Sequence, residues 1–356
     1  MKKSDVRELK KELKKAAQQD GIIDWVYGFY VTPDNEIAWE HVQKFYDYDE
    51  DEKFRYLGIL LRVVSTGIGR DMIPVDVKQN EKVLAIREAW DKDEAATIEN
   101  LKPLRDIFVN DYAHTDPYLA TLFHVTYDVP GKASDGARLE DLSTVFDTVV
   151  FALCPAKLSA PALGFDSGDV AELSRRWTIG LPQIGFMYPS FDDRGETRNE
   201  AAFYLKKDTG KDVLNTLFDT EEISGASEDR EDWIQVLTET GVSSETASAI
   251  NDSIIQMEED YISRDTLRKV VEESGGDGNV FDEHYGSVIG DREIAKAAIS
   301  NSTVEIKTDS ANIKAASEQA AFFRTKTIDG IEYILVPVDG VVTVNGVEVV
   351  TSGGEA

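Results

Sequence analysis

Apolar residues recur with helical spacing over residues 1–19, behind Ser4, a residue type that caps helices. The spaced positions are Val6, Leu9, Leu13 and Ala16. After this segment the chain changes to two short runs typical of strands, DWVYGFYV and EIAWEHV. The sequence TPDN between them carries Pro and Asn at positions that suit a β-turn. The pattern therefore predicts an N-terminal helix followed by a β-hairpin.

Three further helices are predicted before residue 115. The first covers 51–64, where one apolar face would consist of Phe54, Leu57, Leu61 and Val64. The second covers 81–90, and the third begins at Pro103, because proline suits the first turn of a helix. The glycines of STGIGRD follow the first of these helices and precede the strand-like run MIPVDV. We interpret them as a helix stop rather than a phosphate loop, since a dinucleotide fingerprint follows a strand and opens a helix.

A β-rich block follows these helices. The run YLATLFHVTYDVP alternates between core and surface positions, and TVFDTVVFALC is apolar nearly throughout, as a central strand would be. The runs QIGFMYP and AAFYLKK complete the block. Strands and helices are mixed without a regular βαβ rhythm. The predicted fold class is therefore α+β, with a mixed sheet and flanking helices.

The composition changes at Asp219. From there to Asp265 the chain has fourteen acidic and two basic residues, which predicts an acidic subdomain. Its helices are expected to be capped by Ser227, Ser244 and Ser263. A helical apolar stripe is predicted at Ala247, Ile250, Ile254, Met257 and Tyr261.

Two dipeptides mark hairpins near the C-terminus. Asp329-Gly330 and Asn345-Gly346 each stand between β-branched runs, which is a strong hairpin signal. The predicted organisation is thus a basic N-terminal helix, an α+β core domain, an acidic helical subdomain and a small β-hairpin module. Their predicted ranges are 1–20, 21–218, 219–300 and 301–356.

The net charge of the chain limits the kinds of partner that it is expected to bind. There are 38 basic and 67 acidic residues, a formal net charge of −29, so the main body is expected to repel nucleic acid and to attract basic partners. Residues 1–19 have the opposite balance, with seven basic and three acidic residues. The single cysteine, Cys154, excludes an internal disulfide and fits a reducing compartment, as a buried thiol. Since no signal peptide or long apolar run is present, a cytoplasmic location away from membranes is expected.

The densest polar cluster lies in SFDDRGETRN. Asp192, Asp193, Arg194 and Arg198 have the residue types that hold Mg²⁺ and phosphate. Neighbouring residues of a strand point to opposite faces, however, and Ser-Phe-Asp-Asp-Arg-Gly is good turn chemistry. We favour a turn that joins two paired strands and keep these four residues as candidate ligands. No cofactor is expected, and no histidine pair has metal-binding spacing. His124 is interpreted as a lone, partly buried side chain rather than a general base.

Several landmark strings occur in a specific order along the chain. They are FRYLGILLRVVSTGIGRDMIPVDV, FHVTYDVP, CPAKLSAPALGF, IGLPQIGFMYPSFDDR and TKTIDGIEYILV. In these strings the chain resembles an uncharacterised bacterial family known as domain of unknown function 4317, over nearly its whole length. The resemblance implies a soluble intracellular bacterial protein. It implies no reaction, cofactor or catalytic residue.

Three functional hypotheses follow. The favoured one is a non-enzymatic binding or scaffold protein whose acidic segment engages a basic partner. The first alternative is a Mg²⁺-dependent enzyme that acts on a phosphate-bearing small molecule through the candidate ligands at Asp192–Arg198. The second is association with RNA or the ribosome through the basic N-terminal helix. We favour docking of that helix on the acidic surface of the same chain, at residues 219–265. The covalent connection between the two raises the effective concentration of the helix near that surface.

Overall fold

The protein is described by a computed structural model in two units, Met1–Glu231 and Asp232–Ala356. The four narrower ranges expected from the sequence remain a prediction. The described residues are 3–16, 21–77, 80–91, 93–132, 138–166, 169–192, 195–197, 200–206, 210–220, 223–300, 303–307, 312–316, 324–336, 342–344 and 347–349.

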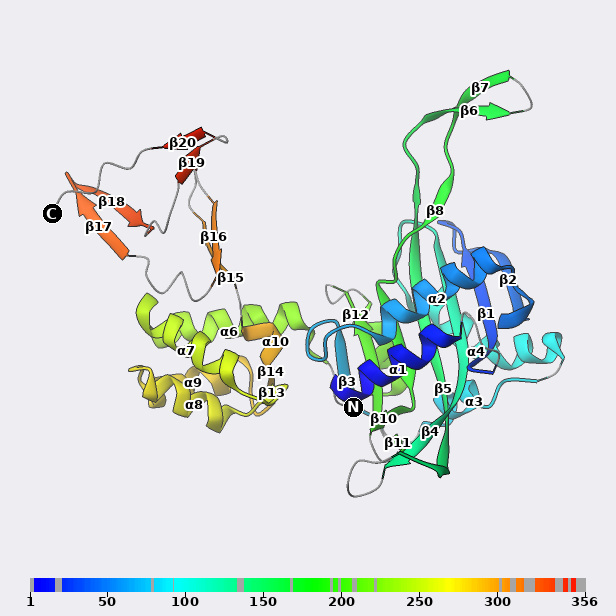
Figure 1. Cartoon of the computed structure of the whole chain (residues 1–356), viewed down its shortest axis with the longest axis horizontal. Helices are drawn as coiled ribbons and strands as arrows, with labels where there is room; N and C mark the ends of the chain where they lie inside the picture. Colours follow the sequence, from blue (N-terminus) through cyan, green and yellow to red (C-terminus); the bar gives the residue numbers. More distant parts are fainter. Residues whose placement is uncertain are drawn as a thin grey trace. The chain divides into compact units, whose positions relative to one another are not determined.

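An antiparallel sheet forms the centre of the first unit (Figure 1). Its strands follow the order β2-β1-β4-β5-β9-β12-β3, and β8 pairs with the end of β5. The strand bounds are β1 Ile23–Val31, β2 Ile37–Lys44, β3 Met72–Asp76, β4 Tyr118–Lys132, β5 Arg138–Leu158, β8 Trp177–Ile179, β9 Ile184–Tyr188 and β12 Glu200–Leu205. The predicted β1–β2 hairpin and the central position of β5 are confirmed.

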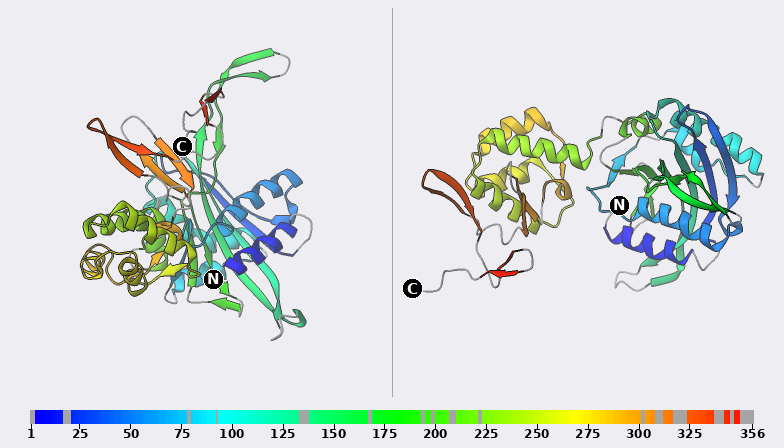
Figure 2. Two further views of the ribbon diagram at one scale, coloured as in Figure 1. Left: turned by 60° about the vertical axis from the view of Figure 1, so that its left-hand side comes forward. Right: turned by 90° about the horizontal axis from the view of Figure 1, so that it is seen from above.

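Helices cover both faces of this sheet (Figures 1 and 2). On one face lie α3 (Glu81–Arg87), α4 (Glu94–Asp111) and α5 (Lys211–Phe218), whose apolar residues join the main core cluster. There, for example, Phe108 stacks on Phe151 with ring centroids 4.3 Å apart. On the other face lie α1 (Lys3–Lys15) and α2 (Glu50–Val64). This arrangement confirms the α+β class.

The basic N-terminal helix is docked on its own unit. All four residues of its predicted apolar stripe are buried, and α1 packs against α2. The apolar stripe of this helix is therefore covered by α2, within its own unit. Docking of its lysines on the acidic segment at 219–265 stays a prediction.

Two helix predictions are wrong in detail. On α2, Phe54 is exposed, and the buried face consists of Leu57, Leu60, Val63 and Val64. Pro103 does not start a helix but lies inside α4, which begins earlier, behind the cap Asp93. Both errors come from local pattern alone, because the sheet beneath each helix decides which positions are covered.

The acidic segment at 219–265 and the residues that follow it form helices. They are α6 (Ala226–Thr240), which crosses the boundary between the units, α7 (Ser244–Gln256), α8 (Arg264–Glu273), α9 (Gly278–Val288) and α10 (Lys296–Ile299). The short strands β13 (Tyr261–Ile262) and β14 (Ile294–Ala295) pair with each other. Ser263 caps α8 as predicted, whereas α7 is capped by Ser243 rather than Ser244. The predicted stripe ends early, since α7 stops at Gln256 and Tyr261 belongs to β13.

Small antiparallel hairpins complete the chain. They are β6 (Ala162–Asp166) with β7 (Asp169–Ser174), β10 (Ser190–Asp192) with β11 (Gly195–Thr197), β15 (Thr303–Lys307) with β16 (Asn312–Ala316), β17 (Arg324–Ile328) with β18 (Ile331–Leu335), and β19 (Val342–Val344) with β20 (Val347–Val349). The predicted turn at Asp329-Gly330 is confirmed, with φ of 52° and 81° at the two residues. Val344 pairs with Val347 around the second predicted turn, whose residues 345–346 lie outside the described ones.

Candidate functional site

The predicted polar cluster lies at a hairpin beside the sheet. Strands β10 and β11 pair, with Asp192 opposite Gly195, and the flanking strands β9 and β12 pair with each other as expected. Asp193, Arg194 and Arg198 lie outside the described residues, and only the backbone of Asp192 is described. A hairpin at this place is thus observed. Ligand binding by Asp192, Asp193, Arg194 and Arg198 stays a prediction.

A second polar cluster, which we call the His124 cluster, surrounds that histidine on the α3 side of the sheet. His124 Nε2 lies 2.9 Å from Asp147 Oδ1, and His124 Nδ1 lies 3.4 Å from Asp24 Oδ2. The imidazole stacks on the Trp90 ring, with centroids 5.2 Å apart. Arg87 reaches the other oxygen of Asp147 at 3.7 Å. The cluster therefore joins β1, β4, β5 and the end of α3.

The interpretation of His124 as a lone side chain is wrong. Asp147 stands on the neighbouring strand, where Thr126 is its direct partner in the register. The signal that sequence reasoning missed is an aspartate inside the otherwise apolar run TVFDTVVFALC. Burial by itself would raise the pKa of Asp147, but the hydrogen bond from His124 and the charges of His124 and Arg87 outweigh it. The pKa of Asp147 accordingly lies below its usual value.

The His124 cluster holds secondary-structure elements together by charge and hydrogen bonding. Asp24 also accepts a hydrogen bond from the Thr126 hydroxyl at 2.9 Å. Within the described residues, His124 Nδ1 and Trp90 Nε1 are buried without a hydrogen-bond partner. The His–Asp pair has the hydrogen-bond geometry of an acid–base dyad, and the pocket described below is lined by other residues.

A further charge network ties α4 to the sheet edge. Arg105 Nη1 lies 2.9 Å from both carboxylate oxygens of Glu40, and Tyr27 donates its hydroxyl to Glu40 at 2.6 Å. Arg105 also contacts Asp106 at 2.8 Å. Burial, together with the adjacent Glu40 carboxylate, raises the pKa of Tyr27 far above its usual value, so the phenol stays protonated and acts as a donor.

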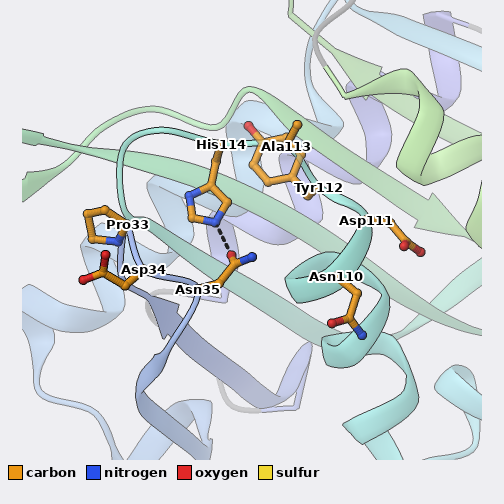
Figure 3. A pocket seen from close by; sticks show the side chains of 8 residues that line it. All are labelled: Pro33, Asp34, Asn35, Asn110, Asp111, Tyr112, Ala113 and His114. Carbon is orange, nitrogen blue, oxygen red and sulfur yellow. Dashed lines mark hydrogen bonds between the residues drawn. The ribbon is translucent and has the colours of Figure 1, made fainter.

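One shallow polar pocket is formed by the β1–β2 turn and the end of α4 (Figure 3). Its volume is about 440 Å³. His114 lies over it, with Nε2 2.6 Å from the Asn35 side-chain oxygen and Nδ1 3.0 Å from the Asp116 carbonyl. Ligand sites are mostly apolar and enclosed, and this pocket is neither, so its geometry assigns no ligand.

Cys154 is buried in β5, as the sequence predicts. Burial raises the pKa of the thiol to about 12, which keeps it protonated at neutral pH. Among the described residues, no group of three or more His, Cys, Asp or Glu side chains is arranged to hold a metal ion. In the same part of the chain, no helix is long and apolar enough to cross a membrane.

The surface of residues 232–300 is dominated by carboxylates. Apart from residues 244 and 245, whose side chains are not described, ten acidic residues are exposed there, against one exposed basic residue, Lys269. We call these ten the acidic surface: Glu239, Glu258, Glu259, Asp265, Glu272, Glu273, Asp277, Glu283, Asp291 and Glu293.

The other cations of this segment are used internally. Arg264 and Arg268 both bind Asp282, at 3.0 Å and 2.6 Å. Arg292 binds Asp232, and Lys296 donates to the carbonyl oxygens of Ile255 and Met257 at the C-terminal end of α7. Three carboxylates of the acidic surface also have a basic partner here, since Arg268 lies 3.1 Å from Glu272, Arg264 3.8 Å from Asp291 and His284 3.1 Å from Glu239. The excess of exposed acidic over exposed basic residues remains.

Comparison with known proteins identifies the chain's family. The family model described as "Domain of unknown function (DUF4317)" matches residues 1–347. The chain belongs to this family. A search of curated proteins gives no match. Membership in DUF4317 confirms the resemblance of the landmark strings and assigns no activity.

Proposed function

We propose that this DUF4317 protein is a non-enzymatic binding protein that engages a basic partner through the acidic surface of residues 232–300. The observation that supports the proposal most is the imbalance of exposed charge there, ten carboxylates to one ammonium group. Surface potentials of one sign raise the local concentration of oppositely charged ligands and speed their association. A lysine- or arginine-rich protein segment is the partner chemistry that this surface fits.

The contacts of the reactive side chains agree with a binding role. His124 is held by Asp147 and stacked under Trp90, and the thiol of Cys154 is protonated and buried. Both residues therefore serve the packing of the first unit. The carboxylates at 232–300, by contrast, stand on the outside of helices whose buried residues, such as Leu267 and Phe281, already form a core.

The test uses a labelled oligolysine peptide and the full chain, with fluorescence anisotropy at physiological ionic strength, where the Debye length is about 8 Å. In one variant, the exposed pair after α7 is reversed by Glu258→Lys and Glu259→Lys. Affinity for the peptide should fall about fivefold, since each exposed charge contributes only a fraction of a kcal/mol. Added salt should weaken binding by the wild-type chain.

A matched control carries the same change of charge in the first unit, through Glu88→Lys and Glu99→Lys, which are also exposed. It should change the affinity by less than about twofold, because surface charges act mainly within a Debye length. Equal losses in the two variants would show that only net charge matters, and the proposal would then fail. Absence of peptide binding by the wild-type chain would also refute it.

A further inference from the structure

A ribbon of two strands leaves the sheet of the first unit and exposes apolar side chains. Strand β4 begins at Tyr118, opposite Pro155, and past this point β5 continues to Leu158 beside β8 (Figure 1). There Leu158 pairs with Trp177 and Ala156 pairs with Ile179. Paired residues share a face, and so do alternate residues along one strand. Leu158, Trp177 and Ile179 therefore share one face, and we call them, together with the exposed Leu181 just after β8, the arm patch. Each of them is between 41% and 59% exposed.

The arm patch is basic in an otherwise acidic chain. Lys157, Arg175 and Arg176 are exposed at the same level of the ribbon. The two segments that form this part, 155–161 and 175–183, contain no Asp or Glu, whereas the chain as a whole has a formal net charge of −29. By the same alternation, Lys157 and Arg176 lie on the opposite face of the ribbon from Leu158 and Trp177, whereas Arg175 stands two residues before Trp177. An exposed apolar row with a cation beside it is the surface of an interaction site whose partner is apolar and acidic.

A patch of that chemistry exists on the same unit, at the start of α2. Phe54 is 75% exposed, and it lies three and four positions after the exposed Asp51 and Glu50. Residues at this spacing share one face of a helix. Gly58, one turn further, is exposed as well, so this face is flat beyond the phenylalanine. We call Glu50, Asp51 and Phe54 the α2 patch.

Both patches lie on the α2 side of the sheet. A Cβ built on Gly185 would contact Val63 of α2, and Gly185 pairs with Ala152 of β5. Alternation along β5 places Leu158 on the same side as Ala152. Both patches are nevertheless exposed in the single chain. One chain therefore presents a basic apolar surface and an acidic apolar surface that do not cover each other.

We propose that the occupant of the arm patch is the α2 patch of a second copy, and that two copies form a two-fold dimer through two reciprocal contacts. In this dimer Trp177 packs with Phe54 of the partner subunit, and Arg175 faces the partner's acidic residues at the start of α2. With two-fold symmetry, the arm patch of each copy contacts the α2 patch of the other, so the same contact forms twice and no further copy is added. The repulsion between two acidic chains is screened within about 8 Å at physiological salt, so the direct contacts decide the outcome.

The first experiment measures the mass of the full chain by sedimentation equilibrium at physiological ionic strength. The wild-type chain should be a dimer, and Trp177→Glu and Phe54→Glu should each raise the dissociation constant at least about tenfold, because central aromatic residues dominate interfaces. The control is Val145→Glu, which changes an equally exposed residue of β5 away from the ribbon and should leave the dimer intact. Thermal melting of each variant monitors its folding.

A second experiment reverses the charges on both patches and leaves their apolar side chains unchanged. Arg175→Glu with Arg176→Glu should weaken the dimer, and so should Glu50→Arg with Asp51→Arg. All four changes together should restore it, since the contacts are then reversed and not lost. A monomeric wild-type chain overturns the proposal. So does a dimer whose dissociation constant is unchanged by the arginine substitutions and by the substitutions at Glu50 and Asp51. Binding of a monomeric chain to phosphatidylserine vesicles, lost in Trp177→Glu, would likewise overturn it and identify a membrane surface as the occupant.

Discussion

His124 Nε2 donates a hydrogen bond to Asp147 Oδ1 over 2.9 Å, although 23 residues separate them in the sequence. The bond joins β4 to β5, and Trp90 covers the ring from the end of α3. A histidine that the sequence pattern marks as a lone, partly buried side chain thus has two specific contacts in the first unit. Its contribution should appear in stability measurements.

Stability should depend on acid pH through Asp147. Its pKa is lower in the folded chain than in the unfolded one, so the carboxylate stabilises the fold above the unfolded pKa. That contribution is lost as the pH falls through the folded pKa. Asp147→Asn should lower the free energy of unfolding at neutral pH by about 1 kcal/mol, a value reduced for the partial exposure of the pair. Urea titrations of both proteins should converge at strongly acidic pH, and a difference that grows with acidification would contradict the assignment.

The Arg105–Glu40 pair should behave as a coupled unit. Arg105→Leu leaves the largely buried Glu40 carboxylate beside Tyr27 without its cation and should cost about 3 kcal/mol of unfolding free energy. Adding Glu40→Gln should recover part of this loss, because the uncompensated charge is removed. A double-mutant cycle by chemical denaturation measures the coupling. Strict additivity of the two substitutions would show that the residues act independently.

Cys154 should be inert in the folded protein. Burial raises the pKa of its thiol to about 12, so little thiolate exists at mildly alkaline pH. A disulfide reagent such as Ellman's reagent should therefore leave the native chain unmodified and label one thiol after denaturation. Rapid labelling of the native chain would place the thiol at an accessible surface.

The sequence predicts elements whose signals are local. The β1–β2 hairpin and the Asp329-Gly330 turn depend on neighbouring residues, and both are observed. The apolar face of α2 was assigned wrongly, because the sheet and not the helix decides that Leu60 is covered and Phe54 is exposed. The His124–Asp147 contact required the register of two strands, which single-sequence patterns do not provide.

The candidate sites differ in the same way. Asp192 occupies a hairpin, as its turn chemistry suggested, whereas ligand binding by its neighbours remains a prediction. The acidic character of 219–300 was evident from composition. Which carboxylates are exposed, and that Arg264 and Arg268 converge on Asp282, became visible only in the folded structure.

Hydrogen–deuterium exchange of the full chain, with and without excess oligolysine peptide, tests the central claim most directly. The acidic surface extends from Glu239 in α6 to Glu293 before β14, so binding there should slow amide exchange in residues 232–300. Exchange in β1 and β4 should be unchanged. Protection confined to residues outside 232–300, or no protection at saturating peptide, would contradict the proposed binding function.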